Sequence, residues 1–427
     1  MPLFGNKLQV SERLTGEDAV LSGNFLLLLI TWILMNGASP ISDTFSSKYF
    51  VSLGATPFML SGMFFLSSLA IAFVQFPGGY LADQHGRKWL VTVMTFGLTF
   101  CYLFFIFAPS WQWIVVGLVT QNLCLIYRPA LFSMMIDSLH PSKRATGLNF
   151  YSVVTGLIAV PAPLIAGALV LVKGNYISPQ SILGMRIAYT IVFAAYIAAC
   201  IVRLKLKETL PTQNQSARPN FLKAFRQYGQ TVRESLKVWR EAPKSAYYLL
   251  ITSVGINSIT AACQIFLVLY ATETLKITGS QYAIAAAMMA LGPMLPLLFA
   301  GFRMDMTGRK RYLLLGYLLY VPAMLLFVRA NFYMLLVSFF LLGFANILEA
   351  NGSQALLGDL IPRANRGRAF GGLQFFTYIA QAFVYLLVGF LYSYIGTWVP
   401  FALFAAMALP LGLTVALKIS DPKNKEH

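Results

Sequence analysis

Three ionisable residues stand out because they lie inside or at the end of long apolar runs: Asp43, Arg128 and Glu349. Charged groups at membrane depth are costly, and those that persist usually take part in function. Glu349 comes ten residues before Asp359, about 15 Å along a helix, and Arg128 comes nine residues before Asp137. A carboxyl group in low-dielectric surroundings favours its neutral form, whereas a nearby guanidinium favours the ionised form. A carboxylate such as that of Glu349 can therefore be protonated reversibly, and the permanently charged guanidinium of Arg128 can influence that protonation.

We predict that Glu349 is the main proton-coupling carboxylate and that Arg128 modulates its protonation. The alternative is that neighbouring Asn and Gln side chains satisfy the two groups separately. Asp43 is the next candidate for a proton site. An equally good interpretation of Asp43 is a helix-end carboxylate at the membrane surface, paired with Lys48.

The elements that hold these residues must be membrane helices. Of 427 residues, 58% are hydrophobic and only 11% are charged, and the mean hydropathy is +0.68. Soluble proteins carry about 25% charged residues, so a soluble multidomain enzyme is excluded. A span needs roughly 20 residues. The apolar segments predict twelve spans, centred near residues 34, 68, 98, 124, 158, 192, 258, 290, 320, 345, 380 and 407.

The positive charges indicate how these spans are oriented. The net charge is +17, and 26 of the 32 Lys and Arg residues fall on one side of the predicted spans, together with both termini. Positive loops stay in the cytoplasm. We therefore expect a multi-pass protein of the inner or plasma membrane with both termini cytoplasmic, and contacts with membrane lipid rather than with nucleic acid.

An internal repeat organises the chain. Gly79–Lys88 (GYLADQHGRK) recurs as Gly301–Lys310 (GFRMDMTGRK), with five identities at one spacing of 222 residues. Asp137 and Asp359 have the same spacing. Six predicted spans separate the copies, an even number, so both halves have the same orientation. Parallel repeats of this kind predict a transporter built from two bundles around a site at the membrane midplane.

The repeated segment must reverse the chain sharply after a span. Glycine supports such a turn and the close approach of helices, and a carboxylate is favoured near a helix N-terminus. We predict that charged groups pair across this turn in each half, with Asp137 and Asp359 as further partners of the arginines. The residues concerned are Gly79, Asp83, Gly86, Arg87, Asp137, Asp305, Arg309 and Asp359.

On these residues the chain resembles the major facilitator superfamily. Gly79–Lys88 matches that family's G-x-L-A-D-x-x-G-R-K loop between spans two and three, and Gly301–Lys310 matches its weaker second copy. The resemblance implies an all-α membrane protein, with twelve transmembrane helices in two parallel-repeat six-helix bundles that work by alternating access. It implies bundles at 1–203 and 245–427 and a cytoplasmic linker at 204–244. It also implies that Asp83 and Arg87 latch the cytoplasmic side of the outward-open state.

Within the superfamily, the run Ser133–Asp137 (SMMID), followed by Pro141 and Arg144, resembles the multidrug:proton antiporters. Those exporters carry G-x-x-x-G-P-x-x-G-G in span five. Only Pro163 and Gly167 match it here. In the alternative interpretation, the prolines of this segment simply kink a packed helix.

The family fold implies that spans four and ten, with Arg128 and Glu349, form opposite walls of a central cavity. Neutral polar and aromatic side chains at helical spacing would complete an amphipathic pocket. The predicted wall consists of Trp32, Asn36, Gln121, Asn122, Tyr127, Tyr151, Asn257, Gln264, Phe266, Asn346, Gln374, Tyr378 and Gln381.

These features favour a secondary active transporter that exports amphipathic small molecules in exchange for protons. The alternatives are a proton-coupled importer of an organic anion or sugar, with Arg128 binding the anion, and a non-transporting sensor or lipid-handling protein on the same fold. The sequence contains no P-loop, HExxH or nucleophile elbow, so we expect neither ATP-driven transport nor enzyme activity. We expect no metal or other cofactor, a proton gradient as the energy source, and a monomer.

The linker carries ten basic and three acidic residues between Arg203 and Lys244. Apolar residues among the basic ones in Asn220–Arg240 predict an amphipathic helix on the inner membrane surface. A solvated connector is the alternative.

Overall fold

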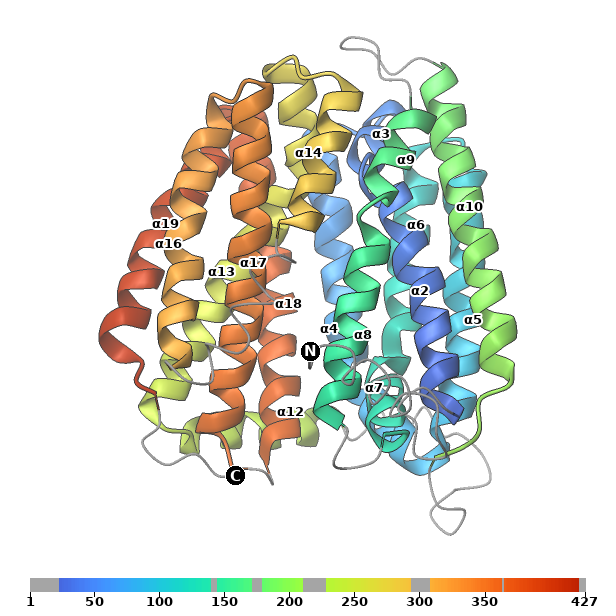
Figure 1. Cartoon of the computed structure of the whole chain (residues 1–427), viewed down its shortest axis with the longest axis vertical. Helices are drawn as coiled ribbons and strands as arrows, with labels where there is room; N and C mark the ends of the chain where they lie inside the picture. Colours follow the sequence, from blue (N-terminus) through green and yellow to red (C-terminus); the bar gives the residue numbers. More distant parts are fainter. Residues whose placement is uncertain are drawn as a thin grey trace, which may run out of the picture.

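The computed structural model describes residues 23–139, 144–170, 179–209, 228–292, 308–362 and 365–421, which form helices joined by short turns (Figure 1). The helices of the N-terminal half are α2 Gly23–Asp43, α3 Ser46–Ser52, α4 Pro57–His85, α5 Arg87–Ile106, α6 Trp111–Cys124, η1 Leu125–Tyr127, α7 Arg128–Asp137, α8 Arg144–Ala159, α9 Ala162–Leu169 and α10 Pro179–Leu204. The later helices are α12 Tyr228–Glu241, α13 Lys244–Leu269, η4 Tyr270–Thr274, α14 Gly279–Leu291, α16 Arg309–Val328, α17 Phe332–Leu360, α18 Arg366–Phe390, η6 Leu391–Ile395 and α19 Val399–Lys418.

Eleven helical segments of the described residues are long and apolar enough to cross a membrane. The twelfth expected span, centred near residue 290, includes α14, and residues 293–307 lie outside the described ranges. The all-helical membrane fold predicted from composition is therefore confirmed.

The internal repeat reappears in the helix boundaries. α5 and α16 begin at Arg87 and Arg309 and end at Ile106 and Val328, each pair 222 residues apart. The residue before each helix is a glycine in a backbone conformation that side chains rarely adopt, with φ of 92° at Gly86 and 97° at Gly308. Both turns have the geometry that the sequence motif required.

Among the described residues, spans four and five are interrupted in their middle. Span four changes from α6 to the tight turn η1 and then to α7, where Pro129 is one of the first helical residues. Span five breaks between α8 and α9 beside Pro161 and Pro163. Proline removes a backbone donor and crowds the preceding turn, so these breaks follow from the sequence.

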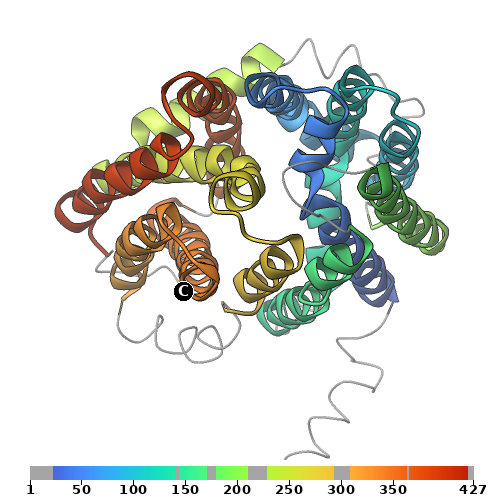
Figure 2. The same cartoon turned by 90° about the horizontal axis from the view of Figure 1, so that it is seen from above.

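The two halves lie side by side, as Figures 1 and 2 show, with α4 of the first half packed against α18 of the second. We call the end that holds α12 the inner end, because the basic loops predict it to be cytoplasmic, and the opposite end the outer end. At the outer end the halves close on each other. Lys48 Nζ donates to Thr272 Oγ1 at 2.8 Å, and the rings of Phe45 and Tyr282 lie 5.7 Å apart.

The linker helix α12 lies across the inner end (Figure 1). Ser235, Val238 and Trp239 are buried on one face, which confirms an amphipathic helix in the linker. The buried face packs on α18, and Ser235 Oγ donates to the carbonyl of Arg368 at 3.1 Å. α12 is thus attached to the protein by its apolar face.

Candidate functional site

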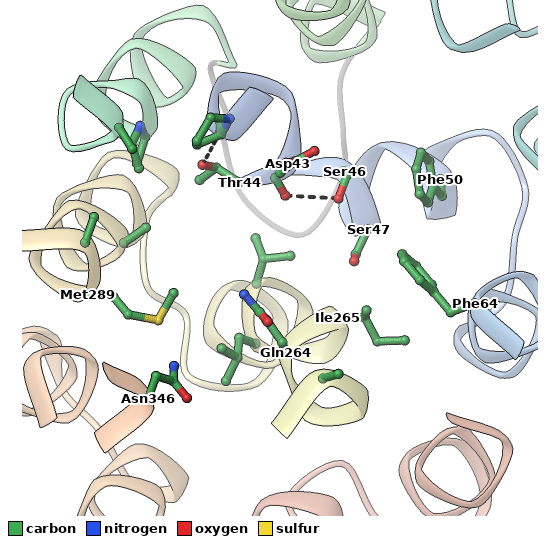
Figure 3. Close-up of a pocket in the computed structure, with 18 of the residues that line it drawn as sticks. Asp43, Thr44, Ser46, Ser47, Phe50, Phe64, Gln264, Ile265, Met289 and Asn346 are labelled. Carbon is green, nitrogen blue, oxygen red and sulfur yellow. Dashed lines mark hydrogen bonds between the residues drawn. The ribbon is translucent and has the colours of Figure 1, made fainter. Parts of the chain in front are cut away.

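A cavity of about 830 Å³ lies between the two halves and is drawn in Figure 3. Helices α2, α4, α5 and α6 of the first half and α13, α14, α17 and α18 of the second contribute side chains to it. Five predicted residues line it: Asp43, Gln121, Gln264, Asn346 and Gln381. The structure thus brings together residues that are more than 300 positions apart in the sequence.

The cavity wall is mainly apolar and neutral, and it includes seven aromatic side chains. The aromatic lining residues are Phe50, Phe64, Tyr102, Phe105, Tyr189, Tyr282 and Tyr385. Gln381 donates to the Tyr385 hydroxyl at 2.8 Å, and the Tyr320 hydroxyl donates to Asn346 at 2.7 Å, so these amides are held in place. Such a wall suits a ligand with a large apolar surface and few hydrogen-bonding groups.

Asp43 is the only charged residue among the described residues that line this cavity. It ends α2, and its carboxylate is solvent-accessible. Ser42 Oγ approaches one carboxylate oxygen at 3.5 Å, while Ser46 Oγ donates to the backbone carbonyl of Asp43 at 3.0 Å (Figure 3). The carboxylate therefore remains available to a ligand.

Lys48 does not pair with Asp43, so that alternative interpretation is wrong. Its side chain is 2% exposed and reaches across the interface to Thr272. Burial lowers the pKa of the Lys48 ammonium below its usual value, and the nearby Glu273 carboxylate partly opposes this shift. Lys48 is thus part of the outer closure.

Glu349 is buried in the second half, with 3% of its surface exposed. Its neighbours in sequence, Asn346 and Ala350, line the cavity, so the carboxylate lies just behind the wall. Asn257 Nδ2 donates to Glu349 Oε1 at 3.1 Å and to the carbonyl of Ser253 at 2.8 Å. The hydroxyl of Ser253 is buried without a partner among the described residues, so it is a donor available beside this group.

Arg128 and Glu349, expected on opposite walls, do not form an ion pair or hydrogen bond with each other among the described residues. Arg128 is exposed, and its Nη1 donates to the Tyr378 hydroxyl at 3.2 Å, on a helix of the other half. The η1 turn ends immediately before Arg128 and changes the direction in which the following residues point. Glu349 meanwhile points into the interior of its own half.

Two further predicted residues, Asn36 and Tyr151, line a second cavity of about 390 Å³ between α2 and α8. This cavity shares Pro40 and Ala159 with the central one, so the two are neighbours. Trp32 lies against Tyr151, with ring centroids 4.2 Å apart. These residues extend the polar surface available to a ligand.

Seven residues expected on the cavity wall line neither described cavity: Trp32, Asn122, Tyr127, Asn257, Phe266, Gln374 and Tyr378. Tyr127 is 3% exposed and carries the Arg203 guanidinium over its ring at 5.5 Å, and Phe266 is fully buried and stacks on Tyr392 at 4.4 Å. Asn122 donates to Ser67 at 2.7 Å within the first half. Gln374 is exposed but does not line either described cavity. Helical spacing alone does not determine how far each helix is rotated about its axis, so the place of these residues on a substrate-binding wall stays a prediction.

The two predicted arginine–aspartate pairs are present. Arg87 pairs with Asp137 in the first half, and Arg309 Nη1 lies 2.7 Å from Asp359 in the second. Each pair joins two helices of the same half. Gly79 and Asp83 belong to α4, but their side chains lie outside the described residues, and Asp305 lies in an undescribed segment.

One pair of carboxylates was missed in the sequence. Glu208, after span six, accepts from the backbone N–H of Arg87 and Lys88 at 3.1 and 2.9 Å. Asp421, after span twelve, accepts from that of Lys310 at 3.1 Å. Both carboxylates bind the positive end of a helix that begins with the repeated motif. The common signal was an acidic residue shortly after the last span of each half.

Comparison with known proteins identifies the family. A model of the Major Facilitator Superfamily matches residues 20–273 and 250–427. The multidrug resistance protein MdtL of Shewanella oneidensis is 27% identical over 307 residues, 69% of each chain. A peptide transporter POT bound to sulfate aligns with a TM-score of 0.73 and 15% identity over 92% of this chain and 93% of its own. The human organic anion transporter MFSD10 aligns with a TM-score of 0.63 and 15% identity over 92% and 97%.

The helical architecture, the repeated turns and the family match agree over nearly the whole chain. The structural relatives are below 25% identity and establish the fold, while the sequence model establishes descent. The chain belongs to the major facilitator superfamily, a family of multi-pass membrane transporters rather than enzymes.

Proposed function

We propose that this transporter exports amphipathic small molecules in exchange for protons, with a preference for substrates that carry a positive charge. The observation that carries the proposal is the cavity wall: aliphatic, aromatic and neutral polar side chains, with the Asp43 carboxylate as the only charged group among the described lining residues. The relative named as a multidrug resistance protein supports the same substrate class.

The proposed division of labour uses the two carboxylates separately. Asp43 faces the substrate from the first half, and Glu349 exchanges the proton behind the wall of the second half. The Glu349 side chain can gain or lose hydrogen-bond donors when α13 and α17 shift, because Asn257 and Ser253 both lie on α13. Such a change in surroundings couples protonation to the transport cycle.

The test is binding of tetraphenylphosphonium, a lipophilic cation, to purified protein. Tetraphenylphosphonium donates no hydrogen bond and its phenyl rings shield its charge, so at about 6 Å from the carboxylate it gains at most about 3 kcal/mol at an effective dielectric of 20. Asp43→Asn should therefore weaken binding by about 10- to 150-fold. Glu241→Gln, which changes an exposed carboxylate on α12, serves as the control and should bind as wild type.

A neutral aromatic ligand of the same size should bind Asp43→Asn and wild type equally. Equal loss for both ligands would show that the variant has damaged the cavity, and unchanged cation binding would refute the role of Asp43.

An anion importer is the second candidate, and the exposed Arg128 guanidinium is the observation that favours it. Arg128→Ala distinguishes the two functions. Loss of binding to organic anions would support import, and retained binding of the cation would support export.

A further inference from the structure

The outward face of α12 carries a stripe of basic and apolar residues. Arg233, Leu236, Lys237 and Arg240 are exposed and recur at intervals of three to four residues, so they share one side of the helix. The stripe continues at the start of α13 with Lys244 and Tyr247, the latter 51% exposed. We refer to these six residues as the basic stripe.

Charge on the basic stripe is only partly neutralised. Lys237 has Glu241 at 3.9 Å on its own helix, and Glu234 pairs with Arg368 of α18 at 3.4 Å. Arg233, Arg240 and Lys244 have no acidic side chain within ion-pair distance among the described residues. A surface with surplus positive charge, an exposed leucine and an exposed tyrosine matches the interface of an anionic leaflet in both charge and polarity.

The buried face of α12 is fitted tightly to the second half. A side chain at Gly372 of α18 would collide with Ser235 and with the Trp239 indole. Ser235 also donates to the Arg368 carbonyl. α12 therefore moves together with α18.

The first residue of α12 reaches the other half. The Tyr228 hydroxyl approaches the carbonyl of Ala72 on α4 at 3.5 Å, and its ring lies 6.0 Å from those of Phe73 and Phe76. Phe375 of α18 completes the cluster, 5.1 Å from Phe76. α12 thus spans the contact between α4 and α18 near the inner end, at the periphery of the helix bundle (Figure 2).

We propose that the basic stripe is a binding surface for anionic phospholipid of the inner leaflet, and that bound lipid favours the conformation described here, which is closed at the outer end. When the halves rock, α4 and α18 change their relative position, and Tyr228 must leave its site on α4. Lipid that holds α12 flat against the inner surface stabilises the conformation in which Tyr228 is seated. A ligand shifts such an equilibrium only by the difference in its affinity for the two states. Here the two states differ because Tyr228 is seated on α4 in only one of them, and that is the state in which lipid holds α12 flat against the inner surface.

The test compares nanodiscs of zwitterionic lipid with nanodiscs that contain phosphatidylglycerol. Spin-label distances across the outer end report the conformation, and titration with a fluorescent phosphatidylglycerol reports binding. Each basic residue near an anionic surface contributes ~1 kcal/mol, so Arg233→Gln, Lys237→Gln and Arg240→Gln together should weaken binding by about 100-fold. The same variant should lose the conformational response to phosphatidylglycerol.

A control variant removes the same charge elsewhere on the inner end. Lys205, Lys207 and Arg311 are exposed there, and their replacement by Gln should leave both readouts close to wild type. Equal losses in both triple variants would overturn the site and leave only a general charge effect.

Tyr228→Ala separates lipid binding from its consequence. It should bind phosphatidylglycerol as wild type does but show no change in outer-end distances. A full conformational response in Tyr228→Ala would overturn the proposed connection between α12 and α4.

Discussion

Replacement of Glu349 by glutamine is the sharpest test of how transport is coupled to protons. Glutamine has almost the same shape, and its carbonyl oxygen can keep the 3.1 Å hydrogen bond from Asn257. The side chain lies behind the cavity wall and does not line it, so we expect substrate Kd to change by less than about threefold, or ~0.7 kcal/mol. What the variant loses is the ability to gain and release a proton.

The expected effect on accumulation follows from the energy in the gradient. Each pH unit across the membrane supplies 1.36 kcal/mol per proton, about a tenfold concentration ratio. Wild-type proteoliposomes given such a gradient should accumulate substrate about tenfold for each proton exchanged, whereas Glu349→Gln should reach a ratio of about 1. Counterflow, which needs no gradient, should continue in the variant.

The assay is uptake of labelled substrate into liposomes under an imposed pH gradient, with the exposed Glu241→Gln as matched control. Gradient-driven accumulation that survives in Glu349→Gln would refute the assignment and would make Asp43 the proton site. Loss of counterflow as well would mean that the substitution disturbs the fold or the cavity rather than coupling alone.

Two further predictions concern the ends of the cavity. Asp83→Asn should shift the transporter toward inward-open states and reduce transport without preventing folding, as measured by cysteine accessibility from both sides; an unchanged labelling pattern would contradict the latch. Because burial lowers the pKa of Lys48, the conformation closed at the outer end binds fewer protons than one in which Lys48 is solvated, so its stability should rise with pH as the pH passes from the lowered pKa toward the ordinary value of 10.5. Lys48→Met should favour outer closure at neutral pH, because it removes a buried ammonium while Thr272 keeps its own hydrogen bond to Val268, and it should abolish this pH dependence. Spin-label distances across the outer end are the measurement. Longer distances in the variant than in wild type would contradict the prediction.

Much of the architecture could be predicted from the sequence, because membrane spans and their repeat leave strong local signals. The turns at Gly86 and Gly308 and the two arginine–aspartate pairs follow from motif residues at one spacing. Positions of side chains on the cavity wall were less predictable. An apolar helix in a membrane has no hydrophilic face to indicate its rotation, so Phe266 was indistinguishable from a cavity residue.

Two errors arose where tertiary contacts reversed the local signal. Arg203, at the predicted end of the first bundle, was counted with the basic residues of the linker, yet α10 extends past it and its side chain is fully buried. Likewise, the pattern of α12 predicted an apolar face, but not that α18 rather than lipid would cover it. The sequence shows that the apolar face of a helix must be buried, but it does not show whether protein or lipid buries that face.

The buried Arg203 has a consequence for how the first half assembles. No acidic side chain pairs with it among the described residues; instead its guanidinium bonds to the hydroxyls of Thr31 and Thr95 and lies over the Tyr127 ring. These partners come from α2, α5 and η1, and no single one replaces the water that the guanidinium gives up. We therefore expect the guanidinium to enter the interior only when all four segments meet. The first half should thus complete its packing in one concerted step, after its sixth helix has been inserted.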